Sequence, residues 1–430
     1  MMELCPQNSA TATANAGGGL EDHLSDLPQH LLLSILSLLP TREAVATSSL
    51  SRRWRNAWSS LPSLDLGTEL VKAGASSAPK AWAEVVLRLL SFRDAPVLRC
   101  RISNALEKCR HDVDRAIGIL VDRGVRDLGV GSLRVGAYRL PSSLFRCDSI
   151  RVLELRGCLL GLPPQGFDGF PRLETLRLVE ATFDGGTFDR LVRGSSVLEN
   201  LVVDGCFGFK KLVVSSPTLR SFDVACNTWE ILEIEHAPRL SQSSVSLSFL
   251  NPKHTSDLRP LLQGLVRVGR LSLQDDFVWV CFQEGVSWKH FPATFSNLKK
   301  LAIDANLRKG DDVGVVSWFL ENSPNLAELS IMDHPLVSAK RTLDVNHWRT
   351  KAPFHCLIHH LAKVEIHFAA EHECIMEFMT FLIENGRALR QITAISLVRQ
   401  EKTFKLKQSL LDMQKRFPWV RLLFKNFRKV

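Results

Sequence analysis

The stretches IRVLELRGC (Ile150–Cys158), LETLRLVEA (Leu173–Ala181) and LENLVVDGC (Leu198–Cys206) share one pattern, and that pattern decides the fold. Each has apolar residues at its first, fourth and sixth positions, and successive stretches begin 23 and 25 residues apart. Apolar residues that alternate with polar ones are typical of a short strand with one buried face. A strand that returns at so regular a spacing predicts a solenoid whose units bury their apolar side chains against their neighbours.

The same apolar frame occurs at eight places, and the early ones are spaced by 25, 23, 25 and 21 residues. These spacings fall in the range of leucine-rich repeats, about 20–29 residues. Two extra frames, at 209–214 and 229–234, fall midway between others and are predicted to be convex-side strands or very short units, and the register is least certain over 240–265. The eight frames are Val125/Leu128/Val130, Ile150/Leu153/Leu155, Leu173/Leu176/Leu178, Leu198/Leu201/Val203, Leu219/Phe222/Val224, Val268/Leu271/Leu273, Leu298/Leu301/Ile303 and Leu326/Leu329/Ile331.

The position three residues past each frame is where the chain turns away from its strand. This class of repeat needs a small or hydrogen-bonding side chain there, because the backbone groups at the turn must find partners. Cys, Asn, Asp or His occupies most of these positions, which argues against a chance pattern. The residues are Cys158, Ala181, Cys206, Asn227, Asp276, Asn306 and His334.

In such a stack the strands form a concave sheet, and the residues that point outward from it can contact a ligand. This face mixes both charge signs with small polar groups, whereas a nucleic-acid groove is more uniformly basic and carries stacking aromatic residues. A protein or peptide target is therefore favoured, although any one of these side chains is more often simply solvated. The predicted target-binding residues are Glu154, Arg156, Arg177, Asp204, Asp223, Arg270, Lys300 and Asp304.

The first 66 residues have another pattern. Between Pro28 and Pro40 the sequence QHLLLSILSLL has seven large aliphatic residues, but it is far too short to span a bilayer, which needs about 20. Three short helices are predicted, with Pro28 in the first turn, Thr41 as the N-cap of the second helix and Ser51 as the cap of the third. So small a bundle cannot bury all its aliphatic side chains. We therefore expect an apolar face that docks on another protein, or else packs on the rest of its own chain.

The motifs LP (27–28), IL (35–36), LPTREAV (39–45) and SLSRRWR (49–55) resemble the F-box of the plant family of F-box/leucine-rich-repeat/FBD proteins. In that family the F-box binds the adaptor of a cullin-RING ubiquitin ligase. The resemblance thus implies a non-catalytic substrate-recognition subunit of an SCF-type ligase. One departure is His30, where relatives usually carry an acidic residue. The residues implied to contact the adaptor or to support that contact are Leu24, Leu27, Pro28, Leu32, Ile35, Val45, Leu50 and Trp54.

From Phe354 onward the pattern predicts a strand at 363–368, a helix over 371–385, a strand at about 391–397 and a basic helix over 405–416. Within it, KVEI (363–366) and FMTFLIENGRAL (378–389) resemble the FBD region of the same family. We expect this region to cap the open edge of the repeat. No metal site is expected, because zinc-type spacing is missing from the nearby ligand-type residues His355, His359, His360, His367, His372 and Cys374.

The net charge of +9 leaves one alternative open, a basic nucleic-acid-binding protein without a ligase role. Much of this charge lies in Arg52–Arg55 and in the Lys and Arg residues of 405–429. Binding of that kind would weaken steeply with salt. The sequence contains no Walker loop, no complete GxGxxG and no GxSxG elbow, so neither a cofactor nor catalysis is expected. A hydrolase with an unrecognised site is the other rival.

The predicted fold class is α/β: a three-helix F-box, an irregular leucine-rich-repeat solenoid and an α/β FBD-like cap. The expected partners are the ligase adaptor and, through it, cullin and RING proteins, together with an unknown target protein; neither a membrane nor nucleic acid is expected. Ten cysteines without CxxC pairs, and the lack of a leader or an Asn-x-Ser/Thr sequon, favour the nucleus or the cytoplasm. The predicted segments are a disordered tail (1–21), the F-box (22–66), a linker (67–80), the solenoid (81–353) and the FBD-like region (354–430).

Overall fold

The computed structural model describes fifteen stretches of the chain. The predicted tail, Leu24, the turn residues Asn227 and His334, and His372 lie outside them. The described residues are 27–67, 78–91, 93, 95–103, 109–132, 134–136, 138–208, 211–226, 231–247, 258–278, 280, 294–333, 347–369, 373–397 and 404–426.

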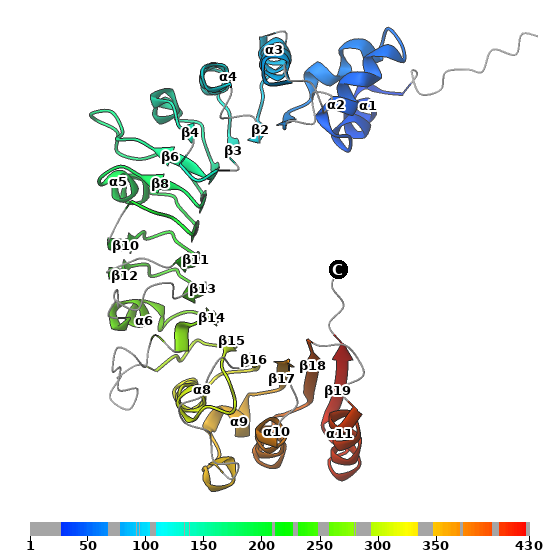
Figure 1. Cartoon of the computed structure of the whole chain (residues 1–430), viewed down its shortest axis with the longest axis vertical. Helices are drawn as coiled ribbons and strands as arrows, with labels where there is room; N and C mark the ends of the chain where they lie inside the picture. The colour runs from blue at the N-terminus through cyan, green and yellow to red at the C-terminus, as the bar shows by residue number, and fades with distance from the viewer. Residues whose placement is uncertain are drawn as a thin grey trace, which may run out of the picture.

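The main element is a 14-stranded sheet in which every neighbouring pair of strands is parallel. Its strands line the inside of an open arc, in chain order from one end to the other (Figure 1). The predicted solenoid is therefore confirmed. The strands are β1 (Ser63–Leu66), β2 (Arg99–Ser103), β3 (Asp127–Gly131), β5 (Val152–Arg156), β7 (Thr175–Val179), β9 (Asn200–Asp204), β11 (Ser221–Cys226), β13 (Gln242–Leu247), β14 (Arg270–Asp275), β15 (Lys300–Asp304), β16 (Glu328–Asp333), β17 (Lys363–Phe368), β18 (Gln391–Ser396) and β19 (Arg421–Asn426).

The apolar frames hold this sheet together. Leu153 pairs in register with Leu176, and Leu176 with Leu201, so that equivalent leucines stack from unit to unit. All three are fully buried in a core that runs from β1 to β19. Each leucine contributes about 1.5–3 kcal/mol by leaving water, and no single unit could bury it alone.

Helices and two small sheets cover the convex side (Figure 1). One small sheet, β10 (Lys211–Ser215) with β12 (Ile231–His236), contains most of the two extra frames, which are therefore convex-side strands. The other joins β4 (Tyr138–Arg139), β6 (Cys158–Leu160) and β8 (Thr182–Phe183). The covering helices are α3 (Ala78–Ser91), α4 (Arg110–Asp122), η4 (Ser142–Arg146), α5 (Thr187–Gly194), α6 (Arg259–Leu265), α8 (Gly310–Asn322), η6 (His347–Thr350), α9 (His355–His359), α10 (Glu373–Asn385) and α11 (Phe404–Arg416).

The stretch of uncertain register contains strand β13. A serine, Ser243, occupies the register position that holds an apolar residue, most often leucine, in the other strands of the sheet, and it pairs with Phe222 of β11. Its hydroxyl donates a 2.6 Å hydrogen bond to the Phe222 carbonyl, which satisfies the buried oxygen. A polar residue at an inward position therefore hid this unit from the apolar pattern.

The turn positions behave as the repeat requires. Cys158 and Cys206 are fully buried, and their thiols lie 3.6 Å and 3.5 Å from the carbonyl oxygens of Val130 and Leu178 in the preceding strands. Burial raises the pKa of Cys158 to about 12, so this thiol stays protonated and unreactive at neutral pH. These cysteines are structural.

The C-terminal region continues the sheet. Strands β17, β18 and β19 add to β16 in parallel register, with Leu329 beside Val364 and Ile366 beside Ala394. The region thus covers the edge of β16, as expected of a cap. The last strand of the sheet is then β19, and the sheet ends at that strand's outer edge. The predicted strands and helices of this region are present, whereas β19 itself was not predicted.

A small helical head (residues 27–61) precedes β1. It contains α1 (Gln29–Ser37), α2 (Thr41–Ala46) and the 3-10 helices η1 (Thr47–Ser49) and η2 (Trp54–Ser60), around a small core of its own. Sheet and helix boundaries differ from the predicted segments: β1 already belongs to the large sheet at Ser63, and α3 begins at Ala78. In the part of the chain that the structure describes, no helix is long and apolar enough to cross a bilayer.

Two capping predictions were wrong. Thr41 does not cap α2, whose N-cap is Pro40; its buried hydroxyl instead accepts a hydrogen bond from the Asp65 backbone N–H of β1, at 2.8 Å. Ser51 is not the N-cap of η2 either, because that position is Arg53, although the Ser51 hydroxyl accepts a hydrogen bond from the Trp54 backbone N–H at 3.4 Å. Thr41 therefore ties the head to the first strand of the sheet.

Candidate functional site

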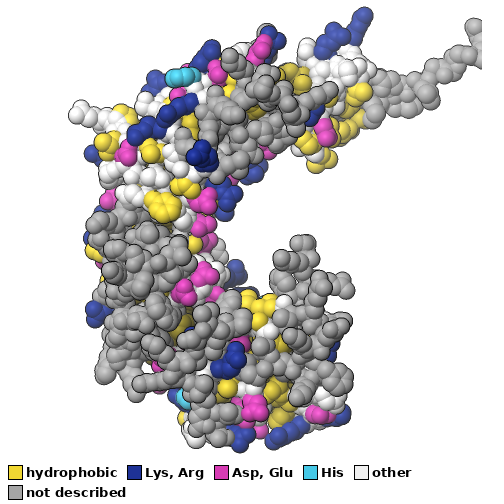
Figure 2. Space-filling view, viewed as in Figure 1, with side chains coloured by type: hydrophobic (Ala, Val, Ile, Leu, Met, Phe, Trp, Pro, Cys, Tyr) yellow, Lys and Arg dark blue, Asp and Glu magenta, His cyan; other side chains and the backbone are white. Residues whose placement is uncertain are grey.

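One face of the head leaves large aliphatic side chains in water. Leu31 and Ile35 of α1 are 41% and 36% exposed, Leu38 at its C-cap is 85% exposed, and Leu50 after η1 is 66% exposed. Figure 2 shows apolar side chains on the head at one end of the arc. The helix also has buried leucines, Leu32 and Leu36, so it is apolar on more than one side. Such an exposed cluster marks an interaction surface.

The structure divides the residues predicted to bind an adaptor. Pro28, Ile35 and Leu50 are exposed and can touch a partner directly. Leu32 and Trp54 belong to the buried core of the head and can only support the face. Leu27 and Val45 are half-buried, and Leu24 lies outside the described residues. Sequence reasoning missed Leu31, one turn before Ile35 on α1, and Leu38, the C-cap of that helix.

A buried arginine joins the head to the solenoid. Arg93 is 2% exposed, and its guanidinium donates to the Trp58 carbonyl oxygen at 3.2 Å and to the Leu61 carbonyl oxygen. Arg123 of the solenoid in turn donates to the Arg93 carbonyl oxygen at 2.7 Å. Burial, and secondarily the charge of Arg123, lowers the pKa of Arg93 to about 10, so it remains charged at neutral pH. These bonds fix the head's orientation on the sheet.

The concave face presents the residues predicted to bind a target. All eight occupy strand positions whose side chains point away from the core, so the predicted strand alternation is correct. In Figure 2 the inner face of the arc carries acidic and basic side chains together. Whether any of them binds a target stays a prediction.

Ion pairs across strands already use much of the charge at the N-terminal end of this face. Glu154 lies 3.5 Å from Arg101 and 3.7 Å from Arg177, and Arg156 lies 3.9 Å from Glu180. Gly129 stands between Arg101 and Glu154 in the register; a Cβ there would come within 3.1 Å of the Arg101 side chain. Exposed pairs of this kind contribute only about 0–1 kcal/mol, so a target can displace them.

The middle of the concave face is less charged. Ser244, Ser272 and Ala302 follow one another along the central row of β13, β14 and β15. Beside them, Asp223 accepts a 3.0 Å hydrogen bond from the Ser244 backbone N–H, and burial raises the pKa of Asp223 above its ordinary value. Lys300 pairs with Glu328 at 2.7 Å. This section has small and polar side chains in its central row.

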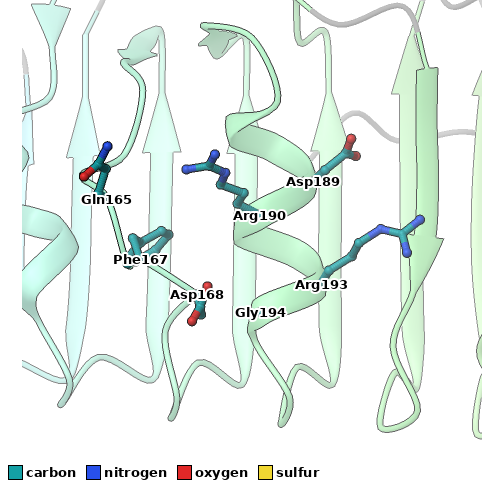
Figure 3. Close-up of a pocket in the computed structure, with 8 residues that line it drawn as sticks. Gln165, Phe167, Asp168, Asp189, Arg190, Arg193 and Gly194 are labelled. Carbon is teal, nitrogen blue, oxygen red and sulfur yellow. The ribbon is translucent and has the colours of Figure 1, made fainter.

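A pocket on the convex side lies between the loop 165–168 and α5, with a cavity volume of about 590 Å³ (Figure 3). Arg190 points toward Phe167, while Arg193 points away and pairs with Glu235 at 3.2 Å. The loop can approach the end of α5 closely because residue 194 is a glycine: a Cβ there would lie 1.8 Å from the Asp168 carbonyl oxygen. Both charge signs line this open pocket, and no reactive group is poised in it.

The histidines of α9 lie at the surface. His355, His359 and His360 are exposed, with ring centroids 4.6–6.2 Å apart. Among the described residues, no group of three or more His, Cys, Asp or Glu side chains is arranged to hold a metal ion.

Comparison with known proteins agrees with this architecture. An F-box domain model matches residues 24–66, and an FBD model matches residues 351–393. The model for the repeats of the FBD-associated F-box protein At5g56370 matches residues 113–331, just over half of the chain. The chain belongs to the F-box/FBD/LRR-repeat family.

Its relatives include the F-box/FBD/LRR-repeat protein At1g13570 of Arabidopsis thaliana, 27% identical and covering 95% of this chain and 99% of its own. The F-box/LRR-repeat protein At3g26922 of the same plant is 32% identical over 60% of this chain and 92% of its own. Among solved structures, a leucine-rich-repeat protein of Leptospira interrogans is 13% identical, covers 86% of this chain and 91% of its own, and has a TM-score of 0.32.

In this F-box/FBD/LRR-repeat protein the three matched segments share one sheet. The F-box match extends through β1, the repeat match runs from α4 to β16, and the FBD match contains β17 and the start of β18. The FBD therefore adds strands to the repeat in the same frame. That frame is readable in the sequence at Leu361/Val364/Ile366 and Leu389/Ile392/Ala394.

Proposed function

We propose that this F-box/FBD/LRR-repeat protein is the substrate-recognition subunit of an SCF-type cullin-RING ubiquitin ligase. The F-box would bind the ligase adaptor and, through it, the cullin and RING proteins, while the concave sheet would hold a target protein. The observation that carries the proposal is the apolar face formed by Leu31, Ile35, Leu38 and Leu50. A face of this kind needs a constitutive protein partner, and the F-box match supplies the class of partner.

The chain's contribution in this proposal is proximity and not chemistry. Arg93 and Thr41 hold the F-box against the first unit, so a target on the concave face would stay at a fixed distance from the adaptor. Holding two reactants together converts a bimolecular transfer into one with a high effective concentration. No residue of this chain has to touch the bond that forms, and we propose no catalytic role for it.

The target is proposed to be a protein with a mixed polar surface. Glu154, Arg156 and Arg177 have intrachain ion partners that a target's charges would replace. For Asp204 and Arg270 the structure records no ion pair within the described residues, and both are exposed. Contacts that exchange one ion pair for another add specificity more than affinity. We expect a target whose charges complement this pattern and whose centre fills the polar section at Ser244 and Ser272.

The test is co-purification of the full chain with the ligase adaptor, using a matched pair of variants. Ile35 on the F-box face and Val197 elsewhere on the chain are 36% and 38% exposed. Ile35→Glu should lose the adaptor and Val197→Glu should retain it, in each case at ~0.5 M salt, where charge interactions are screened within a few ångströms. Retention of the adaptor by Ile35→Glu would overturn the assignment of this face.

The salt condition also tests the nucleic-acid alternative. A complex held by an apolar face should survive high salt, whereas binding through phosphate contacts falls steeply with salt concentration. Proximity labelling in cells, with and without a proteasome inhibitor, should then enrich candidate targets, and fluorescence imaging of the tagged chain tests the proposed location in nucleus or cytoplasm. A chain that binds nucleic acid in low salt and never enriches the adaptor would favour the alternative.

A further inference from the structure

The edge strands at the two ends of the large sheet differ in what covers them. At the first strand, β1, the Asp65 backbone N–H donates to Thr41 of the F-box, so the head covers that edge. At the last strand, β19, no described element pairs with the outer edge. An uncovered strand edge is a template for another strand. The FBD end of the arc (Figure 1) therefore has a docking surface that the F-box end lacks.

The open backbone groups can be assigned from the hydrogen bonds. Arg421 donates its backbone N–H to the Arg390 carbonyl oxygen at 2.8 Å, which directs its backbone groups inward to β18. Backbone groups of alternate residues point to opposite edges, so those of Leu422 and Phe424 point outward. The Leu422 N–H is taken by the Gln414 side chain of α11, at 2.8 Å. Among the described residues, none takes the outward backbone groups of Phe424 and Asn426.

The side chains along this edge are apolar at the centre and basic at the ends. Leu422, Leu423 and Phe424 are only half-buried, whereas the register partners Ile392 and Ala394 in β18 are fully buried. Arg421 and Lys425 are exposed on the concave side and have no recorded ion pair among the described residues. The neighbouring charges Lys415 and Arg416 already pair with Asp412 and Glu384, at 3.2 Å and 3.3 Å.

A second copy of this chain fits the edge poorly. Two β19 strands related by a two-fold axis that keeps the concave faces together would run antiparallel. The register that pairs the whole of 421–425 in both copies sets Leu423 opposite itself. That register places Arg421 directly opposite Lys425 of the second copy, and it does so twice. Like charges directly opposite each other destabilise a strand pair. The charge pattern instead suits a strand that carries acids at these two places.

We propose that the outer edge of β19 binds an extended, acidic segment of a partner protein, which adds to the sheet as a fifteenth strand. Its side chains opposite Arg421 and Lys425 are acidic, and the three residues between them are apolar, matching Leu422, Leu423 and Phe424. The pattern acid–apolar–apolar–apolar–acid reads the same in either chain direction. Lys407, 4.8 Å from the centre of the Phe424 ring, adds a positive charge beside the edge. This site is independent of the adaptor face.

The test is fluorescence anisotropy of the full chain with a labelled peptide whose core is EVLVE. The controls are a KVLVK peptide, an EEVVL peptide that keeps the charge but breaks the pattern, and EVLVE with its three central nitrogens methylated. We expect saturable binding of EVLVE. Each control should bind at least about tenfold more weakly, because the KVLVK and EEVVL peptides lose the charge pairs with Arg421 and Lys425, and the methylated peptide loses hydrogen bonds to the strand.

A pair of charge-reversed variants assigns the binding to this edge. Arg421→Glu with Lys425→Glu should invert the preference from EVLVE to KVLVK. Lys363→Glu in β17 with Arg390→Glu just before β18 makes the same change in net charge on exposed residues, and should keep the preference for EVLVE. The proposal is overturned if EVLVE does not bind at up to about 1 mM, if EEVVL binds equally well, or if both double variants behave alike. Self-association of the chain that the edge reversal alone removes would assign the edge to a second copy.

Discussion

Truncation of the F-box face gives a quantitative test of the docking surface. Leu38 and Leu50 are 85% and 66% exposed, so the pair leaves about one and a half leucine side chains in water. Burying a whole leucine side chain is worth about 1.5–3 kcal/mol. The double variant Leu38→Ala with Leu50→Ala should therefore weaken adaptor binding by about 2–4 kcal/mol, which is roughly a thirtyfold to almost a thousandfold rise in Kd.

The fold should tolerate this change. Neither residue belongs to the buried core of the head, so the free energy of unfolding should change by about 0.5 kcal/mol or less. The matched control is Leu162→Ala, because Leu162 is 67% exposed on a solenoid unit far along the chain from the F-box.

The assay is calorimetric titration of the purified full chain with the purified ligase adaptor. The wild type and Leu162→Ala should give the same Kd, and the double variant a much larger one. A double variant whose Kd stays within threefold of the wild type would refute the reasoning, as would an equal loss of affinity in the Leu162 control.

Two further predictions concern the solenoid and are checked by denaturant unfolding. Gly194→Ala would place a Cβ 1.8 Å from the backbone oxygen of Asp168, so it should lower the free energy of unfolding by about 3 kcal/mol. Gly118→Ala in α4, whose new Cβ would meet nothing within 4 Å beyond its chain neighbours and its own helix backbone, should raise it by about 0.5–1 kcal/mol. Equal effects would contradict the close approach. His367 has its pKa lowered from 6.5, mainly by burial, so the unfolded chain binds more protons below that pH. Stability should therefore fall as the pH drops below 6.5, less so in His367→Gln, and a His367 pKa above 6.5 by NMR titration would contradict this.

The repeat could be predicted from sequence because its signal is periodic and its cause is burial. Every described residue of the eight frames lies in the large sheet or at its margin, and the leucines stack as the spacing implied. The frame at β13 was not recognised because its central position holds Ser243. A count of apolar residues cannot detect a buried serine whose hydroxyl is satisfied by a hydrogen bond within the protein. The strands β17 and β18 carry the same frame, but the change of motif at Phe354 led to their assignment as a separate cap.

The candidate sites were less readable, for two physical reasons. Helix α1 is apolar on more than one side, so its periodicity could not tell the core residue Leu32 from the exposed Leu31 and Leu38. On the concave face, strand alternation gave the correct side for Glu154 and Arg177. Their mutual ion pair depends on which strands become neighbours, and that follows only from the register.

Because the sheet continues without a break from β1 to β19, the number of strands sets the distance between the two ends of the molecule. Neighbouring strands stand about 4.8 Å apart, so inserting or deleting one unit would lengthen or shorten the inner path by that step and rotate everything beyond it. Because Arg93 clamps the head at one end, such a change would re-aim the far end relative to the F-box and leave both local surfaces intact. The number of units therefore sets the reach and the aim of the arc.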